Sequence, residues 1–362
     1  MRIGVLGAGQ LGRMLALAGY PLGLDFVFMD PSASACAAPL GEHIHADYDD
    51  EHALTEFCHR VDRATFEFEN VPAPAARFVA ERTTLLPDVA ALGGFQDRLE
   101  EKQRFSDLGI ALAPFSAVDS AATLSAAIDT IGLPAVLKTR RLGYDGKGQA
   151  VLRSADDVAP AWEALGGQAL VLEAFVPFDR EVSILAVRGC DGATAFYPLV
   201  ENVHRDGILR TSRPRAEDPM QARAEQAASR VLDAFDYVGV MAFEFFVRGG
   251  ELLANEVAPR VHNSGHWTIE GAQCSQFENH LRAVAGLPLG STALRGPCAM
   301  VNFIGSAPPT AALAAIPGLH IHHYGKAAKP QRKVGHATIT ADTEAELDSA
   351  LERVIALVDA AA

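Results

Sequence analysis

Residues 237–268 read YVGVMAFEFFVRGGELLANEVAPRVHNSGHWT, and the rest of the chain is organised around this stretch. An apolar and aromatic run at 240–247 and a second apolar run at 251–257 flank the glycine pair at 249–250. Two β-rich runs around a glycine pair are typical of an antiparallel hairpin. We therefore predict a hairpin here.

Two acids interrupt these apolar runs, Glu244 in the first and Glu256 in the second. A buried carboxylate without a partner is costly or becomes protonated, so the pair points to a shared cation. Carboxylate oxygens on a rigid ribbon suit Mg²⁺, which commonly keeps substrate phosphates among its other ligands. The alternative is a solvated face that carries both acids, because such alternation is common in half-exposed sheets.

The register of the hairpin decides whether the two acids can share a cation. With a two-residue turn and regular pairing, Glu244 would lie opposite Asn255, and Glu244 and Glu256 would face opposite sides of the ribbon. A loop or bulge with an odd residue count would bring both acids to one face. The sequence leaves this choice open.

Length and composition limit the classes of protein that fit. The 362 residues are enough for two or three domains, and a net charge of −14 argues against a general nucleic-acid binder. We see no signal peptide or long apolar span, so we expect no membrane partner. The five cysteines are scattered without a CxxC pair, which favours a reduced, cytoplasmic environment.

The first 95 residues alternate strand-like and helix-like segments, which predicts a small doubly wound parallel sheet. An apolar run at 2–6 leads into GAGQLG at 7–12, and Asp30 ends the next apolar run. This pattern matches the dinucleotide fingerprint. Glu69 follows a strand expected at 65–68, where it could meet a ligand or cap the next helix.

A second α/β section follows. Lys138 closes an apolar strand, which is a costly position for a cation unless an anion lies beside it. The loop GYDGKG at 143–148 then joins two strands, so it resembles a hairpin lid whose N–H groups could bind phosphates, with plain turn chemistry as the alternative. His204 lies in a turn between two extended runs, where it is either a ligand contact or an exposed loop residue.

The tail, residues 298–362, is expected to hold strands near 299–304 and 337–340 and a final helix over 343–358. Between the strands lies KAAKPQRK at 326–333. Four cations in an acidic protein indicate an anion site, whereas a lone charge run would be a solvated loop.

Five segments together resemble the ATP-grasp superfamily and, within it, the 5-(carboxyamino)imidazole ribonucleotide synthetase family of purine biosynthesis. The resemblance covers essentially the whole chain. One small departure is Leu142, where many relatives have glycine. The five segments are GAGQLGRM at 7–14, GYDGKGQ at 143–149, DGILRTS at 206–212, NEVAPRVHNSGHWT at 255–268 and RKVGH at 332–336.

The resemblance implies a mixed α/β and α+β architecture, an ATP-grasp fold in three parts. These are an N-terminal doubly wound (Rossmann-like) domain at 1–95, an ATP-grasp domain with a glycine-rich lid at 96–290, and a small C-terminal domain at 291–362. It also implies an ATP-dependent carbon–nitrogen ligase that carboxylates 5-aminoimidazole ribonucleotide with bicarbonate through carboxyphosphate. Mg²⁺ would be required beside ATP, and the protein would be a homodimer.

The same resemblance assigns site residues by position. Glu244 and Glu256 would bind Mg²⁺. Arg260, His262 and Asn263 would form the bicarbonate and carboxyphosphate pocket, and Asp145 would join them as a catalytic residue. The ATP contacts would be Arg98, Lys138, Gly143, Tyr144, Asp145, Gly146, Lys147, Gly148, Gln149, Glu173, Ala174, Phe175, Val176, Glu181, His204, Asn255 and Glu256. The ribonucleotide contacts would be Gln10, Leu11, Glu69, Tyr144, Asp145, Lys326 and Arg332.

Three other functions are open at this point. A sister ligase of the same superfamily, such as the formate-dependent glycinamide ribonucleotide transformylase, is the nearest. A dehydrogenase or a non-catalytic nucleotide-binding module fits less well, because neither needs a two-carboxylate Mg²⁺ site. For a dehydrogenase, the sequence also offers no obvious hydride-transfer pair of an acid and a substrate-binding arginine.

Overall fold

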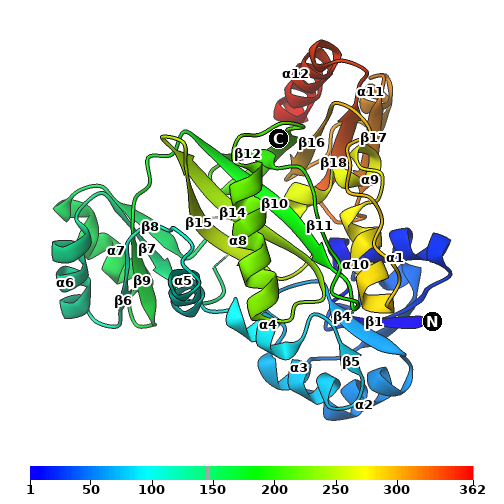
Figure 1. The fold of residues 1–362 in the computed structure, drawn as a ribbon, viewed down its shortest axis with the longest axis horizontal. Helices are drawn as coiled ribbons and strands as arrows, with labels where there is room; N and C mark the ends of the chain where they lie inside the picture. Colours follow the sequence, from blue (N-terminus) through cyan, green and yellow to red (C-terminus); the bar gives the residue numbers. More distant parts are fainter. Residues whose placement is uncertain (144–146, 362) are drawn as a thin grey trace.

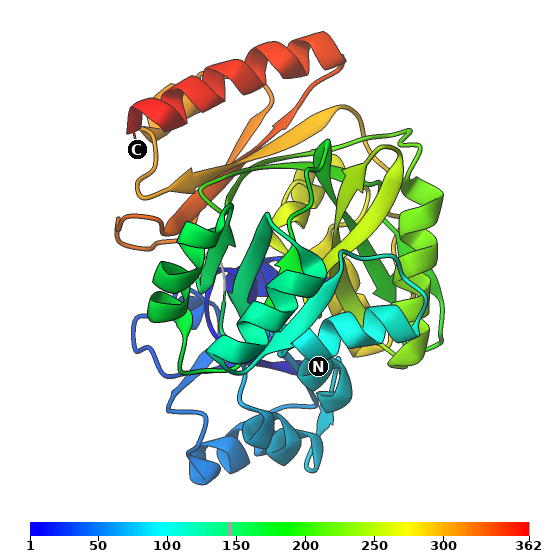
Figure 2. The ribbon, with the colours of Figure 1, turned by 90° about the vertical axis from the view of Figure 1, so that its left-hand side faces the viewer.

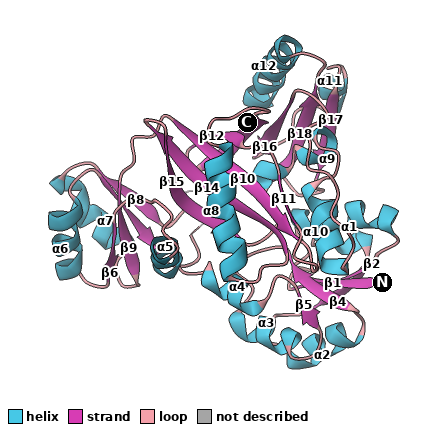
Figure 3. Ribbon diagram, in the orientation of Figure 1, coloured by secondary structure: helices cyan, strands magenta, loops and turns pink. Residues whose placement is uncertain are grey.

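The computed structural model describes residues 1–143 and 147–361, which form three β-sheets with flanking helices (Figure 1). Figure 3 separates the helices from the strands in the same orientation. No helix in the described part of the chain combines the length and the apolar character needed to cross a bilayer.

The N-terminal part forms the predicted parallel sheet, with strand order β3-β2-β1-β4-β5. Helices α1 and α10 pack on one face and α2 and α3 on the other, so the sheet is doubly wound. Its strands are β1 (Arg2–Leu6), β2 (Asp25–Asp30), β3 (Glu42–His45), β4 (Arg63–Phe66) and β5 (Thr84–Leu85). The helices are α1 (Gln10–Gly19), α2 (Glu51–His59), α3 (Ala73–Ala80), α4 (Val89–Gly94) and α10 (Gln276–Ala285), the last contributed from much later in the chain.

A four-stranded antiparallel sheet forms the small lobe at the left of Figure 1. Its order is β6-β9-β7-β8, and α6 and α7 bury its apolar residues. The elements are β6 (Phe115–Val118), α6 (Ala121–Ile131), β7 (Ala135–Thr139), β8 (Gln149–Leu152), α7 (Val158–Leu165) and β9 (Leu170–Ala174). The helix α5 (Arg98–Asp107) connects this lobe to the N-terminal part, and Asp97 is its N-cap.

The largest sheet has nine strands and continues from the central part of the chain into the tail, because β13 pairs with β16. Figure 2 shows α12 lying across the tail strands. The strands are β10 (Arg180–Arg188), β11 (Thr194–Phe196), β12 (Val200–Arg205), β13 (Ile208–Pro214), β14 (Gly239–Arg248), β15 (Glu251–Ala258), β16 (Cys298–Ile304), β17 (Leu319–His323) and β18 (Lys333–Thr340). The helices beside it are α8 (Gln221–Ala234), α9 (Thr268–Gly271), α11 (Thr310–Ala314) and α12 (Glu344–Ala361). Strand β17 was not predicted.

The predicted hairpin is β14–β15, and its register settles the question that the sequence left open. The turn is the two-residue type, with Arg248 opposite Glu251. A β-bulge then shifts the register, so that Glu244 lies opposite Glu256, and Asn255 is the extra residue. Both glutamates therefore lie on the same face of the ribbon.

Candidate active site

Two adjoining cavities lie where the N-terminal part, the small lobe and the large sheet meet. Their volumes are about 370 Å³ and 290 Å³. They share the lining residues Arg98, Glu256, His262, Asn263 and Lys333, so they are two parts of one site.

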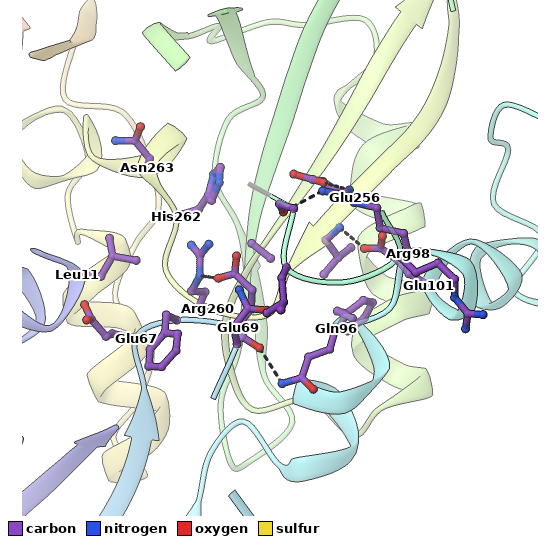
Figure 4. Close-up of a pocket in the computed structure, with 18 of the residues that line it drawn as sticks. Leu11, Glu67, Glu69, Gln96, Arg98, Glu101, Glu256, Arg260, His262 and Asn263 are labelled. Carbon is purple, nitrogen blue, oxygen red and sulfur yellow. Dashed lines mark hydrogen bonds and ion pairs between the residues drawn. The ribbon is translucent and has the colours of Figure 1, made fainter. Parts of the chain in front are cut away.

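The larger cavity, shown in Figure 4, lies beside the N-terminal sheet. Helix α1 and the segment after β4 supply one wall, and the segment after β15 supplies the other. Nine of the residues named from the resemblance line it: Gln10, Leu11, Glu69, Arg98, Gly143, Glu256, Arg260, His262 and Asn263.

The smaller cavity lies between the small lobe and the hairpin. It brings together residues from β7, β8, β10, β12, β14 and β15. Of the residues assigned to ATP and Mg²⁺, nine line it: Arg98, Lys138, Lys147, Gln149, Glu181, His204, Glu244, Asn255 and Glu256.

The two carboxylates of the hairpin face this smaller cavity. Arg98 Nη1 lies 2.6 Å from Glu256 Oε2, and His262 Nε2 lies 3.7 Å from Glu244 Oε1. Burial and the neighbouring Glu256 charge raise the pKa of Glu244 to about 7. Burial alone would also raise the pKa of Glu256, but Arg98 overrides it and holds that pKa below its usual range. Two close carboxylates that cannot both ionise easily fit a site that a cation completes.

His204 is part of β12 and lines the cavity, so it is not an exposed loop residue. Its Nδ1 forms a short ion pair with Glu181 on the neighbouring strand. Burial alone would lower the pKa of His204, but the bond to Glu181 and the nearby Glu244 raise it.

Lys138 has the anionic neighbour that its position requires. Glu173 Oε2 lies 3.1 Å from Lys138 Nζ and 3.0 Å from Lys102 Nζ, and all three side chains are largely buried. Burial alone would raise the pKa of Glu173, but the two ammonium groups lower it to about 2. Among the described residues, both lysines form their ion pairs with this one carboxylate.

Replacing Glu173 with glutamine should destabilise the protein, because two buried ammonium groups would lose their counter-ion. We expect a loss of about 3–5 kcal/mol in the free energy of unfolding at pH 7, measured by urea denaturation. Since the native pKa of Glu173 is the lower one, its contribution is present above the unfolded value of 4.5 and should shrink as the pH falls toward 2.

Glu163→Gln, on the exposed surface of α7 in the same lobe, is the matched control and should change the stability little. A Glu173→Gln protein as stable as this control would show that the two lysines do not depend on Glu173.

The pocket assigned to bicarbonate lies in the segment after β15. Arg260 forms a short ion pair with Glu69, which the sequence placed at the carboxyl end of a strand. Asn263 exchanges two amide hydrogen bonds with Asn302 on β16, at 3.0 and 2.7 Å. A strand of the tail therefore holds one side of this pocket, although nothing in the sequence pattern indicated Asn302.

The glycine-rich turn before α1 already has an anion bound to it. The Glu67 carboxylate accepts hydrogen bonds from the N–H groups of Gly9 and Gly12, the second at 2.6 Å. A dinucleotide pyrophosphate would need these same N–H groups. The dinucleotide-binding interpretation of this motif is therefore wrong for a physical reason: an internal carboxylate occupies the phosphate position.

The basic segment 326–333 reaches the site at two places. Lys326 Nζ donates to Gln10 Oε1 of α1, and Lys333 lines both cavities. Arg332 is exposed, and its Nη1 donates to Ala327 O at 3.3 Å. The segment is therefore more than a solvated loop, but Arg332 lines neither cavity, whereas Lys333, not singled out from the sequence, lines both.

Some assigned residues lie apart from the two cavities or outside the described structure. Ala174, Phe175 and Val176 follow Glu173 but do not line either cavity among the described residues. Gly148 packs against Thr139, with no room for a side chain. Tyr144, Asp145 and Gly146 lie outside the residues that the structure describes.

Helix α5 supplies site residues that sequence reasoning missed. Lys102 reaches Glu173, and Glu101 lines the larger cavity. Glu101 Oε1 accepts the Val257 N–H at 2.6 Å, and burial raises the pKa of this carboxyl to about 8. The two residues are adjacent on a helix with few apolar residues, so their burial could not be read from the hydrophobic pattern.

Three family models match the chain. A ribonucleotide synthetase preATP-grasp domain matches residues 1–96, an ATP-grasp domain matches 103–277, and a phosphoribosylaminoimidazole carboxylase C-terminal domain matches 298–350.

Full-length relatives agree with these models. The N5-carboxyaminoimidazole ribonucleotide synthase of Pseudomonas aeruginosa is 58% identical and covers 99% of this chain and 100% of its own. The Escherichia coli K12 synthase of the same name is 40% identical, covering 98% of this chain and 94% of its own.

Solved structures show the same fold. The Thermus thermophilus N5-carboxyaminoimidazole ribonucleotide synthetase matches with a TM-score of 0.94 and 56% identity, over 98% of each chain. The Aspergillus clavatus enzyme, in complex with ADP and 5-aminoimidazole ribonucleotide, matches with a TM-score of 0.92 and 32% identity, over 99% of this chain and 98% of its own. This chain therefore belongs to the N5-carboxyaminoimidazole ribonucleotide synthase family of ATP-grasp ligases.

Proposed function

We propose that the chain uses ATP and bicarbonate to carboxylate the exocyclic amine of 5-aminoimidazole ribonucleotide, releasing ADP and phosphate. One observation carries the proposal. Two cavities adjoin and share Arg98, Glu256 and His262 among their lining residues, so a nucleotide in one can meet a second substrate in the other. The complex of the Aspergillus clavatus relative with ADP and the ribonucleotide supports these two occupants.

In the first step, a bicarbonate oxygen attacks the γ-phosphorus of ATP, the bond to the bridging oxygen breaks, and ADP leaves with the bonding electrons. The product is carboxyphosphate. Phosphoryl transfer of this kind needs positioning and charge neutralisation more than acid–base chemistry. Lys138 and Arg98 are the cations on the nucleotide side, and Arg260 is the cation on the bicarbonate side.

In the second step, the amine of the ribonucleotide attacks the carboxyl carbon, and the carbon–oxygen bond to phosphate breaks. The nitrogen gives its proton to the departing phosphate, which leaves with the bonding electrons. Gln10, Leu11, Glu69 and Lys326 are the proposed contacts that hold the ribonucleotide beside Arg260, since all lie at the N-terminal wall of the site. Tyr144, Asp145 and Arg332 keep their proposed roles from the family resemblance.

The carboxylates Glu244 and Glu256 are the proposed ligands of Mg²⁺. Their oxygens are the donors that this ion prefers, and their placement on one face by the bulge lets them share it. When bound, Mg²⁺ would neutralise charge on the triphosphate oxygens. Arg98 lies 2.6 Å from Glu256, and His262 lies 3.7 Å from Glu244.

We also propose domain boundaries near residues 95 and 290, a cytoplasmic location and a homodimer, all from the family resemblance. The continuous sheet across β13 and β16 means that the last two domains share backbone hydrogen bonds. We therefore expect the tail and the central part to unfold together.

Phosphate release from MgATP tests the proposed reaction. It should require bicarbonate and 5-aminoimidazole ribonucleotide together, with a much lower rate when either is left out, because both steps use the same site. Equal release with formate and glycinamide ribonucleotide would favour the sister ligase instead. A rate of phosphate release that does not depend on any of these compounds would contradict both assignments.

A further inference from the structure

A row of buried polar side chains lies behind His262, on the face of the large sheet that carries the two carboxylates. Ser183 lies opposite Glu244 across β10 and β14. Asn202 lies opposite Ser212 across β12 and β13. Four side chains in this row are each 5% exposed or less: Ser183, Asn202, Ser212 and the nearby Ser264. We call Ser212, Asn202, Ser183 and Ser264 the buried relay.

Hydrogen bonds join the buried relay into one chain. Ser212 Oγ lies 2.8 Å from Asn202 Oδ1, Asn202 Nδ2 lies 2.9 Å from Ser183 Oγ, and Ser183 Oγ lies 2.8 Å from Ser264 Oγ. The last member, Ser264 Oγ, lies 2.9 Å from His262 Nδ1. The chain thus runs from β13 to the active-site imidazole.

The chain has a direction. The Asn202 amide nitrogen can only donate, so Ser183 Oγ accepts a hydrogen bond from it. The Ser183 hydroxyl can then donate its own hydrogen bond to Ser264 Oγ. Ser264 Oγ then accepts from Ser183 and donates to His262 Nδ1. The Ser264 backbone N–H, which can only donate, also points at His262 Nδ1, at 3.3 Å. Two donors at one ring nitrogen require that nitrogen to be unprotonated.

We propose that the buried relay positions the His262 imidazole as the tautomer with its proton on Nε2, so that it presents a hydrogen-bond donor to the reacting carboxyl group. Nε2 faces the cavity, 3.7 Å from Glu244 Oε1, beyond good hydrogen-bond distance. The identity of the acceptor, an oxygen of bicarbonate or carboxyphosphate, rests on the proposed function. In this tautomer Nε2 donates and cannot take the proton of the amine.

Buried hydroxyl and amide groups are costly unless they are hydrogen-bonded, and apolar side chains would fill the same space without that risk. Within the buried relay, each side chain is hydrogen-bonded to the next one. The relay ends at the imidazole of His262, which lines both cavities. A chain of this kind orients a side chain in the way that outer hydrogen bonds orient catalytic histidines.

The tautomer can be measured on the wild-type protein without substrates. Two-bond ¹H–¹⁵N NMR of protein labelled with [¹⁵N]histidine should show, for His262 at pH 7.5, an unprotonated Nδ1 and a protonated Nε2. The chain has 12 histidines, so the signals are assigned by their loss in His262→Gln. A His262 signal with a protonated Nδ1 would overturn the proposal whether or not the protein turns over.

Variants of the relay give the second arm. Ser264→Ala should populate the other tautomer and lower kcat about ten- to a hundred-fold, with KM for both nucleotides little changed, because a hydrogen bond to a reacting group is lost. Ser183→Ala, one step further away, should have a smaller effect in the same direction.

Thr338→Ala is the matched control, since Thr338 on β18 is a buried hydroxyl with no hydrogen-bond partner among the described residues. It should leave both the tautomer and kcat unchanged. If Ser264→Ala lowers kcat no more than Thr338→Ala does, the relay has only a structural role. If Ser264→Ala fails to fold, the wild-type spectrum still decides the tautomer.

Discussion

Glu256→Gln should abolish turnover while the protein stays folded. Glutamine has nearly the same shape as glutamate, so the hairpin should still form. The proposed Mg²⁺ site, however, would keep only one of its two carboxylates. A bound metal supplies several kcal/mol of charge stabilisation to phosphoryl transfer, and losing about 4 kcal/mol corresponds to a decrease in kcat of roughly a thousandfold.

The matched control is Glu251→Gln, on the same strand but exposed at the turn. It should keep wild-type kcat at the same MgATP concentration, and thermal unfolding would show whether both variants are folded. Near-normal activity of Glu256→Gln at ordinary Mg²⁺ would remove this residue from the metal site.

Lys326→Ala should raise the KM for 5-aminoimidazole ribonucleotide about ten- to a hundred-fold. A charge-assisted hydrogen bond contributes about 1.5–3 kcal/mol, and Lys326 lies beside Gln10 at the proposed ribonucleotide wall. The KM for ATP should change little, because eight of the proposed ATP contacts line the smaller cavity, which does not include Lys326 among its lining residues. Arg332→Ala should act in the same direction but less strongly, since Arg332 is exposed and lines neither cavity.

Lys329→Ala removes an exposed cation from the same loop and serves as the control. It should leave both KM values unchanged. A rise in the KM for ATP alone after Lys326→Ala would show that the basic segment acts on ATP and not on the ribonucleotide. No change in either KM would show that Lys326 binds neither substrate.

The local parts of the fold were predictable because their signals are local. The hairpin around 249–250, the parallel sheet of residues 1–95 and the final helix all follow from hydrophobic periodicity and glycine positions. The bulge at Asn255 was not predictable, because the apolar run at 251–257 does not specify how it pairs with the neighbouring strand. It is nevertheless the feature that brings Glu244 and Glu256 to one face.

The candidate site was predictable where the resemblance supplied motifs and was hidden where it depends on distant pairing. Only the fold shows that Glu67 binds the N–H groups of the glycine turn. Lys102 and Asn302 meet their partners across 71 and 39 positions of the chain, respectively. Neighbouring residues in the sequence carry no information about contacts of this length.

The central claim is that a bicarbonate oxygen attacks the γ-phosphorus of ATP before the amine is carboxylated. The most direct test is a turnover experiment with [¹⁸O]bicarbonate, MgATP and 5-aminoimidazole ribonucleotide, followed by mass analysis of the released phosphate. We predict one ¹⁸O atom in each phosphate molecule. The bicarbonate oxygen that attacks phosphorus stays bonded to it when the amine displaces phosphate from the carboxyl carbon. Phosphate without ¹⁸O, formed together with the carboxylated ribonucleotide, would contradict the carboxyphosphate route.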